Sequence, residues 1–364
     1  MKVYPLKSIS IEEAMNKQFR FVDCMTRNFN GCMSLSRGDL GVKQPNNEPD
    51  FTIQAEKTIA NFFNQEACIL VRGSGTGAIR YGLSSMIKPG ELLMVHDAPV
   101  YSTTVTSIEM FGLNTIKANF NNPDDVISVL QNNDIKAILI QHTRQVPEDS
   151  YNLGELIKLM KSVKDLPIII DENYAVMKVD KIGCENGADL SCFSCFKLQG
   201  PEGIGCVVGK KEYIDRIRKM HYSGGCQVQG WEAQEVLRGL TYAPVLLAVS
   251  AAECEKANEE VRKLDFVKDS MIVNAQSKVM IVELKEPLAR KMLIEAEKLG
   301  GLPNPVGAES KYEIAPMFYK VSGTFLKEDP KRIDTMLRIN VNRAGHETVI
   351  RILSEAYKKA KEDE

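Results

Sequence analysis

The strongest constraint on the fold is a regular alternation, between residues 50 and 220, of short apolar segments with amphipathic segments of helix length. Strands that alternate with helices predict a mostly parallel sheet covered on both faces. We therefore expect a large α/β domain built on a seven-stranded sheet. The predicted strands are Ala67–Val71, Leu92–His96, Asn114–Ala118, Ala137–Gln141, Ile168–Asp171, Leu190–Cys195 and Gly205–Gly209. The predicted helices are Gly77–Met86, Tyr101–Phe111, Pro123–Gln131 and Leu153–Lys164.

The pattern changes after residue 220, where longer helical and alternating segments predict a smaller α+β domain. The N-terminal segment lacks a core of its own, so we expect it to pack on the small domain or on a partner subunit. The elements predicted for the C-terminal part are helical Gln229–Lys263, strands Val279–Leu284 and Leu337–Val341, and helices Pro287–Leu299 and Glu347–Lys361. The predicted boundaries are 1–45 for the N-terminal segment, 46–245 for the large domain and 246–364 for the small domain.

Composition argues against several classes of protein. The net charge is −2 and no basic stripe stands out, so no nucleic-acid partner is expected. The apolar runs are strand-sized, well short of the ~20 residues of a membrane span, so we expect neither a membrane span nor a signal peptide. Nine cysteines, with Cys68 and Cys206 inside apolar runs, indicate reduced thiols in a cytoplasmic protein. Cys192 and Cys195 would point to opposite faces of a strand, and we expect no metal.

A glycine-rich turn, Gly73-Ser74-Gly75-Thr76-Gly77, follows the first predicted strand and opens a helix. Amide groups at a helix start favour a phosphate, and Ser74 and Thr76 can add hydroxyl donors. The same turn also satisfies the dinucleotide-binding pattern G-x-G-x-x-A, with Asp97 after the next strand in the position of the ribose-binding acid. The turn alone therefore leaves a phosphate site and a dinucleotide site open.

Two charged residues lie at the ends of other predicted strands. Asp171 ends a very apolar strand, and Lys197 stands between an apolar strand and a Gly200-Pro201 turn. Partial burial lowers the pKa of a lysine and makes its neutral amine nucleophilic. A phosphate site, a carboxylate and such an amine are the three groups that pyridoxal 5'-phosphate (PLP) requires, for its phosphate, its ring nitrogen and its aldehyde. The sequence therefore predicts a PLP site.

The motifs around Lys197 carry a family resemblance. Ser194-x-x-Lys197-x-x-Gly200-Pro201-x-Gly203-x-Gly205 resembles the lysine motif of class V aminotransferases and cysteine desulfurases, although Phe196 stands where that branch usually has histidine. The stretches Ala98–Thr104 and Leu237–Leu240 resemble the cysteine and methionine metabolism branch instead. Nearly end to end, the chain resembles the YhfS-type group of PLP proteins. The resemblance implies the fold of fold type I PLP-dependent transferases and a homodimer.

The expected roles follow from the motifs and from this resemblance. Lys197 would form a Schiff base with the cofactor and then move protons, and Asp171 would pair with the ring nitrogen. The resemblance implies that Tyr101 stacks on the ring and that Arg338 binds a substrate carboxylate; His142 and Arg144 are further candidate substrate contacts. The residues expected to bind the cofactor are Ser74, Gly75, Thr76, Tyr101, Asp171, Tyr174, Ser194 and Lys197. The Ser223–Gln227 turn is a candidate contact to a partner subunit's phosphate.

We expect a PLP enzyme that acts on an amino acid, with aminotransferase as the first interpretation. A β- or γ-eliminating carbon–sulfur lyase is the alternative, because of Tyr101 and Leu237–Leu240. Two other classes stay open at this point: an NAD(P)-dependent oxidoreductase, which would use Gly73–Ala78 and Asp97, and a non-catalytic PLP-binding protein.

Overall fold

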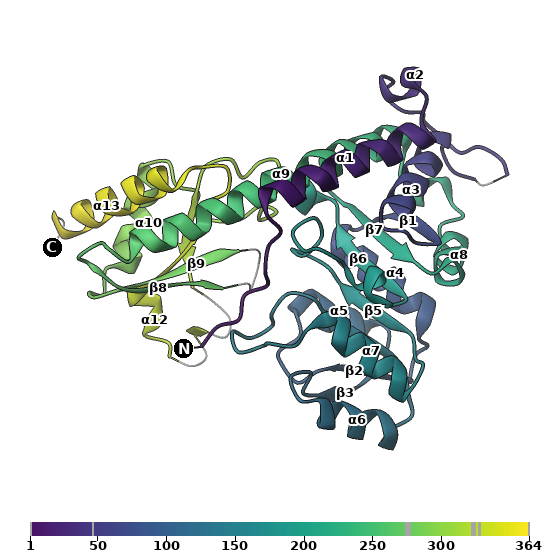
Figure 1. Ribbon diagram of the computed structural model, residues 1–364, viewed down its shortest axis with the longest axis horizontal. Helices are drawn as coiled ribbons and strands as arrows, with labels where there is room; N and C mark the ends of the chain where they lie inside the picture. The colour runs from purple at the N-terminus through teal and green to yellow at the C-terminus, as the bar shows by residue number, and fades with distance from the viewer. Residues whose placement is uncertain (1, 46, 274–277, 322–324, 327–328, 363–364) are drawn as a thin grey trace. The chain divides into compact units, whose positions relative to one another are not determined.

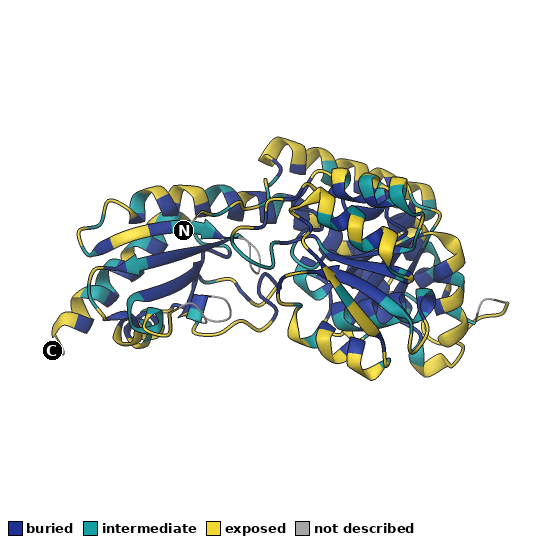
Figure 2. Cartoon of the chain, turned by 90° about the horizontal axis from the view of Figure 1, so that it is seen from below, coloured by how far each residue is buried: buried dark blue, intermediate teal, exposed yellow. Residues whose placement is uncertain are grey.

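The structure is a computed structural model that describes residues 2–45, 47–273, 278–321, 325–326 and 329–362. The chain forms two compact units (Figure 1). The larger unit comprises residues 12–145 and 149–244, and the smaller unit comprises residues 1–11, 146–148 and 245–364. Figure 2 shows that buried residues concentrate in the strands of each unit, whereas the outer helix faces are exposed.

The larger unit is built on a seven-stranded sheet with the strand order β1-β7-β6-β5-β4-β2-β3. Only β7 runs antiparallel to its neighbours β1 and β6, so the prediction of a mostly parallel seven-stranded sheet is confirmed. The strands are β1 (Ala67–Arg72), β2 (Leu92–His96), β3 (Asn114–Ala118), β4 (Ile135–Gln141), β5 (Ile168–Asp171), β6 (Leu190–Ser194) and β7 (Ile204–Gly209).

Helices cover both faces of this sheet, and β5 shows why its sequence is continuously apolar. Ile169 packs in a core with helices on one face, whereas Ile168 and Ile170 pack with helices on the other face. Because successive side chains of a strand point to opposite faces, a strand buried on both sides has no place for a polar residue until its end. The helices of the first face are α4 (Ser74–Met86), α5 (Ser102–Met110) and α8 (Lys211–Met220); those of the second are α6 (Pro123–Asn132) and α7 (Leu153–Val163).

The smaller unit contains a four-stranded antiparallel sheet with the order β10-β11-β9-β8. One face of this sheet packs on helices through an apolar core that includes Met280, Leu337, Met292 and Leu353. The α+β character expected for this part is confirmed. The elements are β8 (Val267–Val273), β9 (Val279–Leu284), α10 (Ala289–Lys298), β10 (Met317–Lys320), α12 (Arg332–Thr335), β11 (Met336–Asn340) and α13 (His346–Glu362).

A single helix, α9 (Gly230–Val261), forms the helical segment expected over Gln229–Lys263 and contains Pro244. The division between the two units falls between Pro244 and Val245. Within the described residues, Gly224–Val261 is the one segment long and apolar enough to cross a membrane, and 56% of its apolar window is buried inside the protein. Core helices of folded domains share these properties, so the segment gives only weak evidence for a membrane span.

The N-terminal part was expected to pack on the small domain or on a partner subunit, and its packing on a partner stays a prediction. Only residues 1–11 group with the smaller unit. Helix α1 (Ile11–Asn28) contacts the larger unit because Phe21 packs edge-on against Phe62 of α3 (Asp50–Phe62), with ring centroids 5.1 Å apart. Helix α1 buries Ala14, Phe21 and Cys24, and neither this helix nor the short α2 (Gly31–Ser34) was predicted.

Candidate active site

The predicted phosphate turn lies at the carboxyl end of β1 and starts α4. Gly73 and Ser74 adopt left-handed backbone with φ of 94° and 57°, and their amides donate to the Gly203 carbonyl oxygen at 2.8 and 3.0 Å. A helix start leaves its first amides without partners inside the helix, so those of Gly75 and Thr76 are placed to bind a ligand oxygen. The Gly203 carbonyl oxygen, just before β7, thus holds the turn in shape.

Hydroxyl groups from three elements gather beside this turn. The Ser74 and Ser194 Oγ atoms lie 2.6 Å apart, and Thr76 Oγ1 lies 3.3 Å from Thr103 Oγ1 on α5. The structure therefore brings together three residues that the sequence assigned to phosphate binding, and it adds Thr103, which the sequence reasoning missed. Hydroxyls and helix amides together form a donor set suited to a phosphate.

Asp171 lies at the carboxyl end of β5 and is 6% exposed. Burial raises the pKa of its carboxyl group from 3.8 to about 6, although hydrogen bonds from Asn173 and the charge of Lys197 act in the opposite direction. A buried carboxylate gains most from a cationic partner in direct contact, which the protonated nitrogen of a pyridine ring would supply.

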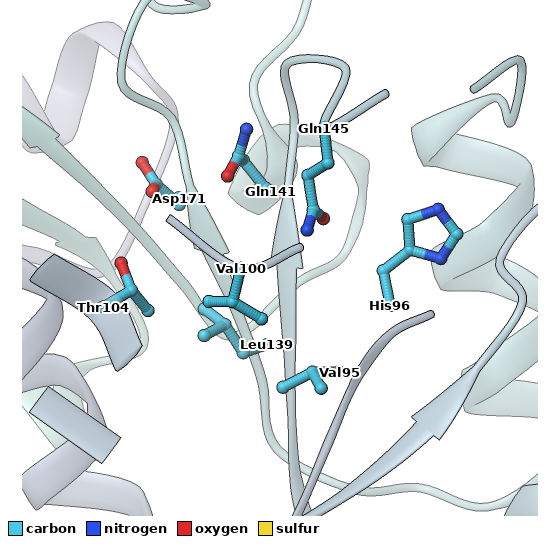
Figure 3. A pocket seen from close by; sticks show the side chains of 8 residues that line it. All are labelled: Val95, His96, Val100, Thr104, Leu139, Gln141, Gln145 and Asp171. Atoms are coloured by element: carbon cyan, nitrogen blue, oxygen red, sulfur yellow. The ribbon is translucent and has the colours of Figure 1, made fainter. Parts of the chain in front are cut away.

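Asp171 also lines a narrow pocket with room for about one water molecule, about 10 Å³. Figure 3 shows the Asp171 carboxylate at one end of this pocket and the His96 ring at the other, with Val100 between them. The lining residues are Val95, His96, Val100, Thr104, Leu139, Gln141, Gln145 and Asp171.

Asn173 connects the carboxylate to the phosphate turn and was not predicted. Its side-chain Nδ2 and its backbone amide donate to Asp171 Oδ1 at 2.7 and 3.0 Å, and its Oδ1 accepts from the Ser194 amide at 3.1 Å. An asparagine two residues after an aspartate at a strand end is a pattern for such a turn, and this is the signal that could have revealed it. Asn173 thus fixes one oxygen of Asp171 next to the hydroxyl cluster.

Gly75 allows Asn173 to take this position. A Cβ atom at Gly75 would lie 2.4 Å from Asn173 Oδ1. Alanine has a higher helix propensity than glycine, so helix propensity alone would not make Gly75→Ala harmful. Any loss of PLP affinity in this variant must therefore come from the overlap with Asn173. We expect the affinity for PLP to fall at least about tenfold, since Asn173 must release Asp171 or Ser194. Absorbance titration of the apoprotein measures it. Gly31→Ala, where a Cβ meets nothing within 4 Å, is the matched control; equal affinities in the two variants would contradict the prediction.

Lys197 follows β6 in a short 3-10 turn (Phe196–Leu198). Its Nζ donates to the Tyr174 hydroxyl at 2.6 Å and lies 4.0 Å from the centroid of the same ring. Two residues near this amine adopt the left-handed backbone that also occurs at Ser74. They are Tyr174, which the amine contacts, and Gln199, two residues further along the chain, with φ of 69° and 65°. Such backbone conformations cluster at functional sites, where the surrounding structure holds them in place.

His142 and Arg144 follow β4 as expected, and neighbouring groups contact both; their role as substrate contacts stays a prediction. His142 is 5% exposed and its Nδ1 lies 2.7 Å from Glu172 Oε2. Arg144 Nη1 donates to the Tyr151 carbonyl oxygen at 2.8 Å, and the guanidinium lies 5.2 Å from the Tyr151 ring. The sequence could place His142 and Arg144 at the sheet edge, but it could not show their contacts with Glu172 and Tyr151.

Two further predicted residues, Tyr101 and Arg338, and one predicted turn come from other segments of the chain. Tyr101 precedes α5 and is 49% exposed, which leaves its ring accessible to a ligand. The Ser223–Gln227 turn contains a short 3-10 turn, Gly224–Cys226. Arg338 lies on β11 of the smaller unit, where its guanidinium is 4.6 Å from the Tyr319 ring centroid. Carboxylate binding by Arg338 stays a prediction.

The strand order rules against the dinucleotide alternative. That site requires the strand that carries the ribose-binding acid to lie beside the strand before the glycine turn. Here β2, which precedes Asp97, is separated from β1 by four other strands, a distance of roughly 24 Å at ~4.8 Å per strand. Asp97 instead lies 3.7 Å from Lys117 Nζ. The spacing of the glycines and Asp97 along the sequence matches the dinucleotide-binding pattern, but the order of the strands in the sheet does not.

All nine cysteines are free thiols, seven of them buried. Cys192 and Cys195 are both buried. Strand β6 ends at Ser194, so Cys195 lies one residue beyond the strand that was predicted to contain it. The close pair is instead Cys68 and Cys206 on adjacent strands, with Sγ atoms 3.3 Å apart. Within the described part of the chain no group of three or more His, Cys, Asp or Glu could hold a metal ion.

Comparison with known proteins assigns the chain to a family. The class-V aminotransferase family model matches residues 49–240, and the model of the YhfS-like C-terminal domain matches residues 256–353. Protein YhfS of Escherichia coli K12 is 50% identical over 98% of this chain and 99% of its own length. The chain belongs to the YhfS-like family. This family shares the fold of fold type I PLP-dependent enzymes, as predicted.

Solved structures agree with this YhfS-like assignment. The crystal structure of the PLP-dependent protein YhfS from Escherichia coli matches with a TM-score of 0.97 at 50% identity, over 99% of this chain and 100% of that one. Cystathione gamma lyase from Micromonospora echinospora matches with a TM-score of 0.69 at 15% identity over 85% and 86% of the two chains, which shows a shared fold. Among curated relatives, L-methionine gamma-lyase of Treponema denticola is 24% identical over 59% of this chain and 55% of its own length.

Proposed function

We propose that this YhfS-like chain binds PLP through Lys197 and acts on an amino acid. The observation that carries the proposal is the Lys197 amine held 2.6 Å from the Tyr174 hydroxyl, in the same unit as the buried Asp171 and the hydroxyl cluster. PLP, when bound, supplies an electron sink that stabilises negative charge at the substrate's α-carbon. The groups required by its phosphate, ring nitrogen and aldehyde all occur within the larger unit, so the donor set fits the cofactor.

Each of these residues has a defined role in the proposed site. Ser74, Thr76 and Ser194 hold the phosphate, and Asp171 keeps the ring nitrogen protonated because its carboxylate needs a cationic partner. Tyr174 accepts a hydrogen bond from Lys197 and thereby fixes the direction of the amine. Tyr174 can also donate to an oxygen of the ligand when the amine is engaged elsewhere. Lys197, once a substrate amine has displaced it, takes the proton from the α-carbon.

We propose transamination as the reaction. In a transamination, one amine would both remove the proton of the α-carbon and return a proton elsewhere, so no second acid would be required. Lys197 provides such an amine, and the match of residues 49–240 to the class-V aminotransferase model supports the proposal. Elimination is the second candidate. Unlike transamination, it needs a second group that acts as an acid near the leaving group. The half-exposed Tyr101 could serve, and the likeness to L-methionine gamma-lyase favours it.

One experiment tests the proposal and separates the two reactions. The purified protein is loaded with PLP, reduced with borohydride and digested, and the label is expected on the peptide that contains Lys197. The loaded protein is then mixed with single amino acids without a keto-acid acceptor. Transamination predicts one equivalent of keto acid and loss of the cofactor's colour, whereas elimination predicts continued release of ammonia. A protein that binds PLP but converts no amine would support the non-catalytic alternative, and one without a label would refute the site.

We also propose that the chain pairs with a second copy and works in a reducing compartment. On α1, Met15, Phe19 and Val22 are 43%, 58% and 40% exposed at a spacing that places them along one face of a helix. Large exposed apolar faces of this kind mark protein–protein interfaces. The nine free cysteines support a cytoplasmic location. Light scattering of the purified protein measures its oligomeric state, and a monomer at micromolar concentration would contradict the pairing.

A further inference from the structure

One buried hydroxyl group beside Asp171 lacks a hydrogen-bond partner among the described residues. It belongs to Thr104, which lies in the first turn of α5 and is 3% exposed. Neighbouring hydroxyls of the same helix bond to the preceding turn: Thr106 Oγ1 donates to the Ser102 carbonyl oxygen at 3.2 Å, and Ser107 does the same one residue further along. Buried polar groups are nearly always paired with protein or with ordered water, so the Thr104 hydroxyl indicates a partner of the second kind.

Thr104 and Asp171 line the same narrow pocket. Figure 3 shows the Thr104 hydroxyl directed toward the side of the pocket on which the Asp171 carboxylate lies. The two groups form no direct hydrogen bond. Asp171 Oδ1 already accepts twice from Asn173, at 2.7 and 3.0 Å, whereas Oδ2 accepts from none of the described residues. Oδ2 is therefore the carboxylate oxygen that is left for a donor in the pocket.

The other polar side chains of the pocket donate elsewhere. His96 Nε2 lies 2.9 Å from Asp149 Oδ1, and the Phe120 amide donates to His96 Nδ1 at 3.2 Å. The side-chain nitrogens of Gln141 and Gln145 donate to residues outside the pocket lining, which leaves each glutamine an acceptor oxygen. Among the described residues that line the pocket, Thr104 therefore supplies the donor that is not yet engaged.

The size of the pocket and its polar groups suit one water molecule. Its volume is about 10 Å³, close to the space that one water requires, and a buried water needs about two to four polar partners. A water in this position accepts from Thr104 Oγ1 and donates to Asp171 Oδ2 and to a glutamine oxygen. Each group in the pocket then has a partner of the opposite kind.

We propose that Thr104 is a positioning residue that acts on Asp171 Oδ2 through one bound water and favours the ionised carboxylate. The inference rests on the proposed function, because Asp171 is the proposed partner of the PLP ring nitrogen. Hydrogen bonds to the charged form of a carboxyl group stabilise that form, and Asn173 supplies them at Oδ1. The water supplies one at Oδ2, and this oxygen keeps a second lone pair for the ring nitrogen.

The surroundings of Asp171 set the direction of the expected effect. Burial is the largest influence and raises the pKa of Asp171 to about 6, with a further rise from the charge of Glu172, whereas Asn173 and Lys197 act in the opposite direction. The bridged hydrogen bond acts in the same direction as Asn173, so its loss should raise the pKa. The ionisable residues that surround Asp171 are His96 of β2, His142 after β4, Glu172 after β5, Cys192 of β6 and Lys197 after β6.

The test measures the pKa of Asp171 in the apoprotein. The free energy of unfolding of each protein is compared with that of its Asp171→Asn counterpart in urea, between about pH 4 and pH 8; the difference stops changing above the pKa of the folded Asp171. In Thr104→Val, which keeps the shape and removes the hydroxyl, this levelling point is expected to rise by about one pH unit. Thr104→Ser retains the hydroxyl and should stay within about 0.3 unit of the parent.

Thr106→Val is the matched control. It removes a threonine hydroxyl from the same helix, but one that bonds to the Ser102 carbonyl oxygen, so the levelling point should equal that of the parent. An unchanged point in Thr104→Val would overturn the inference, and a borohydride label on Lys197 in that variant would leave the proposed function intact. A parent protein without such a label would overturn both. Thr104→Ala replaces Thr104→Val if the latter does not fold; if neither folds, the hydroxyl serves stability and the inference is wrong.

Discussion

Lys197→Ala is expected to remove the covalent link to PLP and to lower turnover by about 10³-fold or more. The ε-amine has two tasks, attachment of the cofactor and proton transfer, and general acid–base catalysis alone accounts for about 10²–10⁴-fold. The fold should persist, since the substitution removes a half-buried side chain, and its hydrogen bond to Tyr174 contributes about 1 kcal/mol. Borohydride reduction followed by mass spectrometry of the digest, together with turnover of the best amino acid, measures both effects.

The control for Lys197→Ala is Lys210→Ala. Lys210 follows β7 and forms an ion pair with Asp189, with Nζ and Oδ1 2.6 Å apart. It lies beyond the opposite end of the strand from Gly205, so its loss should leave labelling and turnover near the parent values. A Lys197→Ala protein that carries the reduced cofactor on another lysine and turns over at the parent rate would refute the role assigned to Lys197.

Asp171→Asn is expected to weaken PLP binding by about a hundredfold at pH 7.5 and to remove its dependence on pH near 6. In the apoprotein, burial raises the pKa of Asp171 to about 6, so the carboxyl group takes up a proton below that pH. The proposed contact requires the ionised form, and PLP affinity should therefore fall as the pH drops below 6. Asparagine cannot ionise, and a charge-assisted hydrogen bond to the ring nitrogen is worth about twice a neutral one. Equilibrium titrations between pH 5 and pH 8 measure the effect.

The same substitution should change the stability of the apoprotein in the opposite direction. The folded-state pKa of Asp171 lies above the usual 3.8, so the folded apoprotein binds more protons than the unfolded chain between these values. Its stability therefore decreases as the pH rises from about 4 to about 6, and the buried charge costs about 3 kcal/mol above that range. We expect Asp171→Asn to recover on the order of 2 kcal/mol at pH 7.5, measured by urea denaturation without PLP. If the Asp171→Asn apoprotein were less stable than the parent apoprotein, the assigned cost of the buried Asp171 charge would be wrong.

These expectations describe one trade-off in the site. Asp171 destabilises the empty fold and, in the proposal, gains its counter-charge when PLP binds, so cofactor binding and stability are coupled. Asn173 limits the cost by donating two hydrogen bonds to Oδ1, which lower the pKa again. Since Asn173 also contacts the Ser194 amide, a change in the phosphate region should be transmitted to the carboxylate.

The sequence by itself determined the elements and the type of site. Buried strands need continuous apolar runs, and helices need an apolar stripe, so β2, β3, β5 and β9 were predicted at their observed bounds. Lys197 and Asp171 stood out because a charge directly after such a run must lie at the sheet edge. Some elements were not predicted, although α1 and α8 each have a clear apolar face: α1, α3, α8, and the strands β8 and β10.

Only the tertiary structure decided which of these pieces meet. The order of the strands moved Asp97 away from the glycine turn and placed β6 next to β5, so that Lys197 and Asp171 share one location. Packing of segments that are distant in sequence brought His142 into contact with Glu172 and Ser74 into contact with Ser194. A local turn brought Lys178 close to Tyr174. The physical reason is that periodicity reports which face of an element is buried, whereas the partner on that face depends on packing of the whole chain.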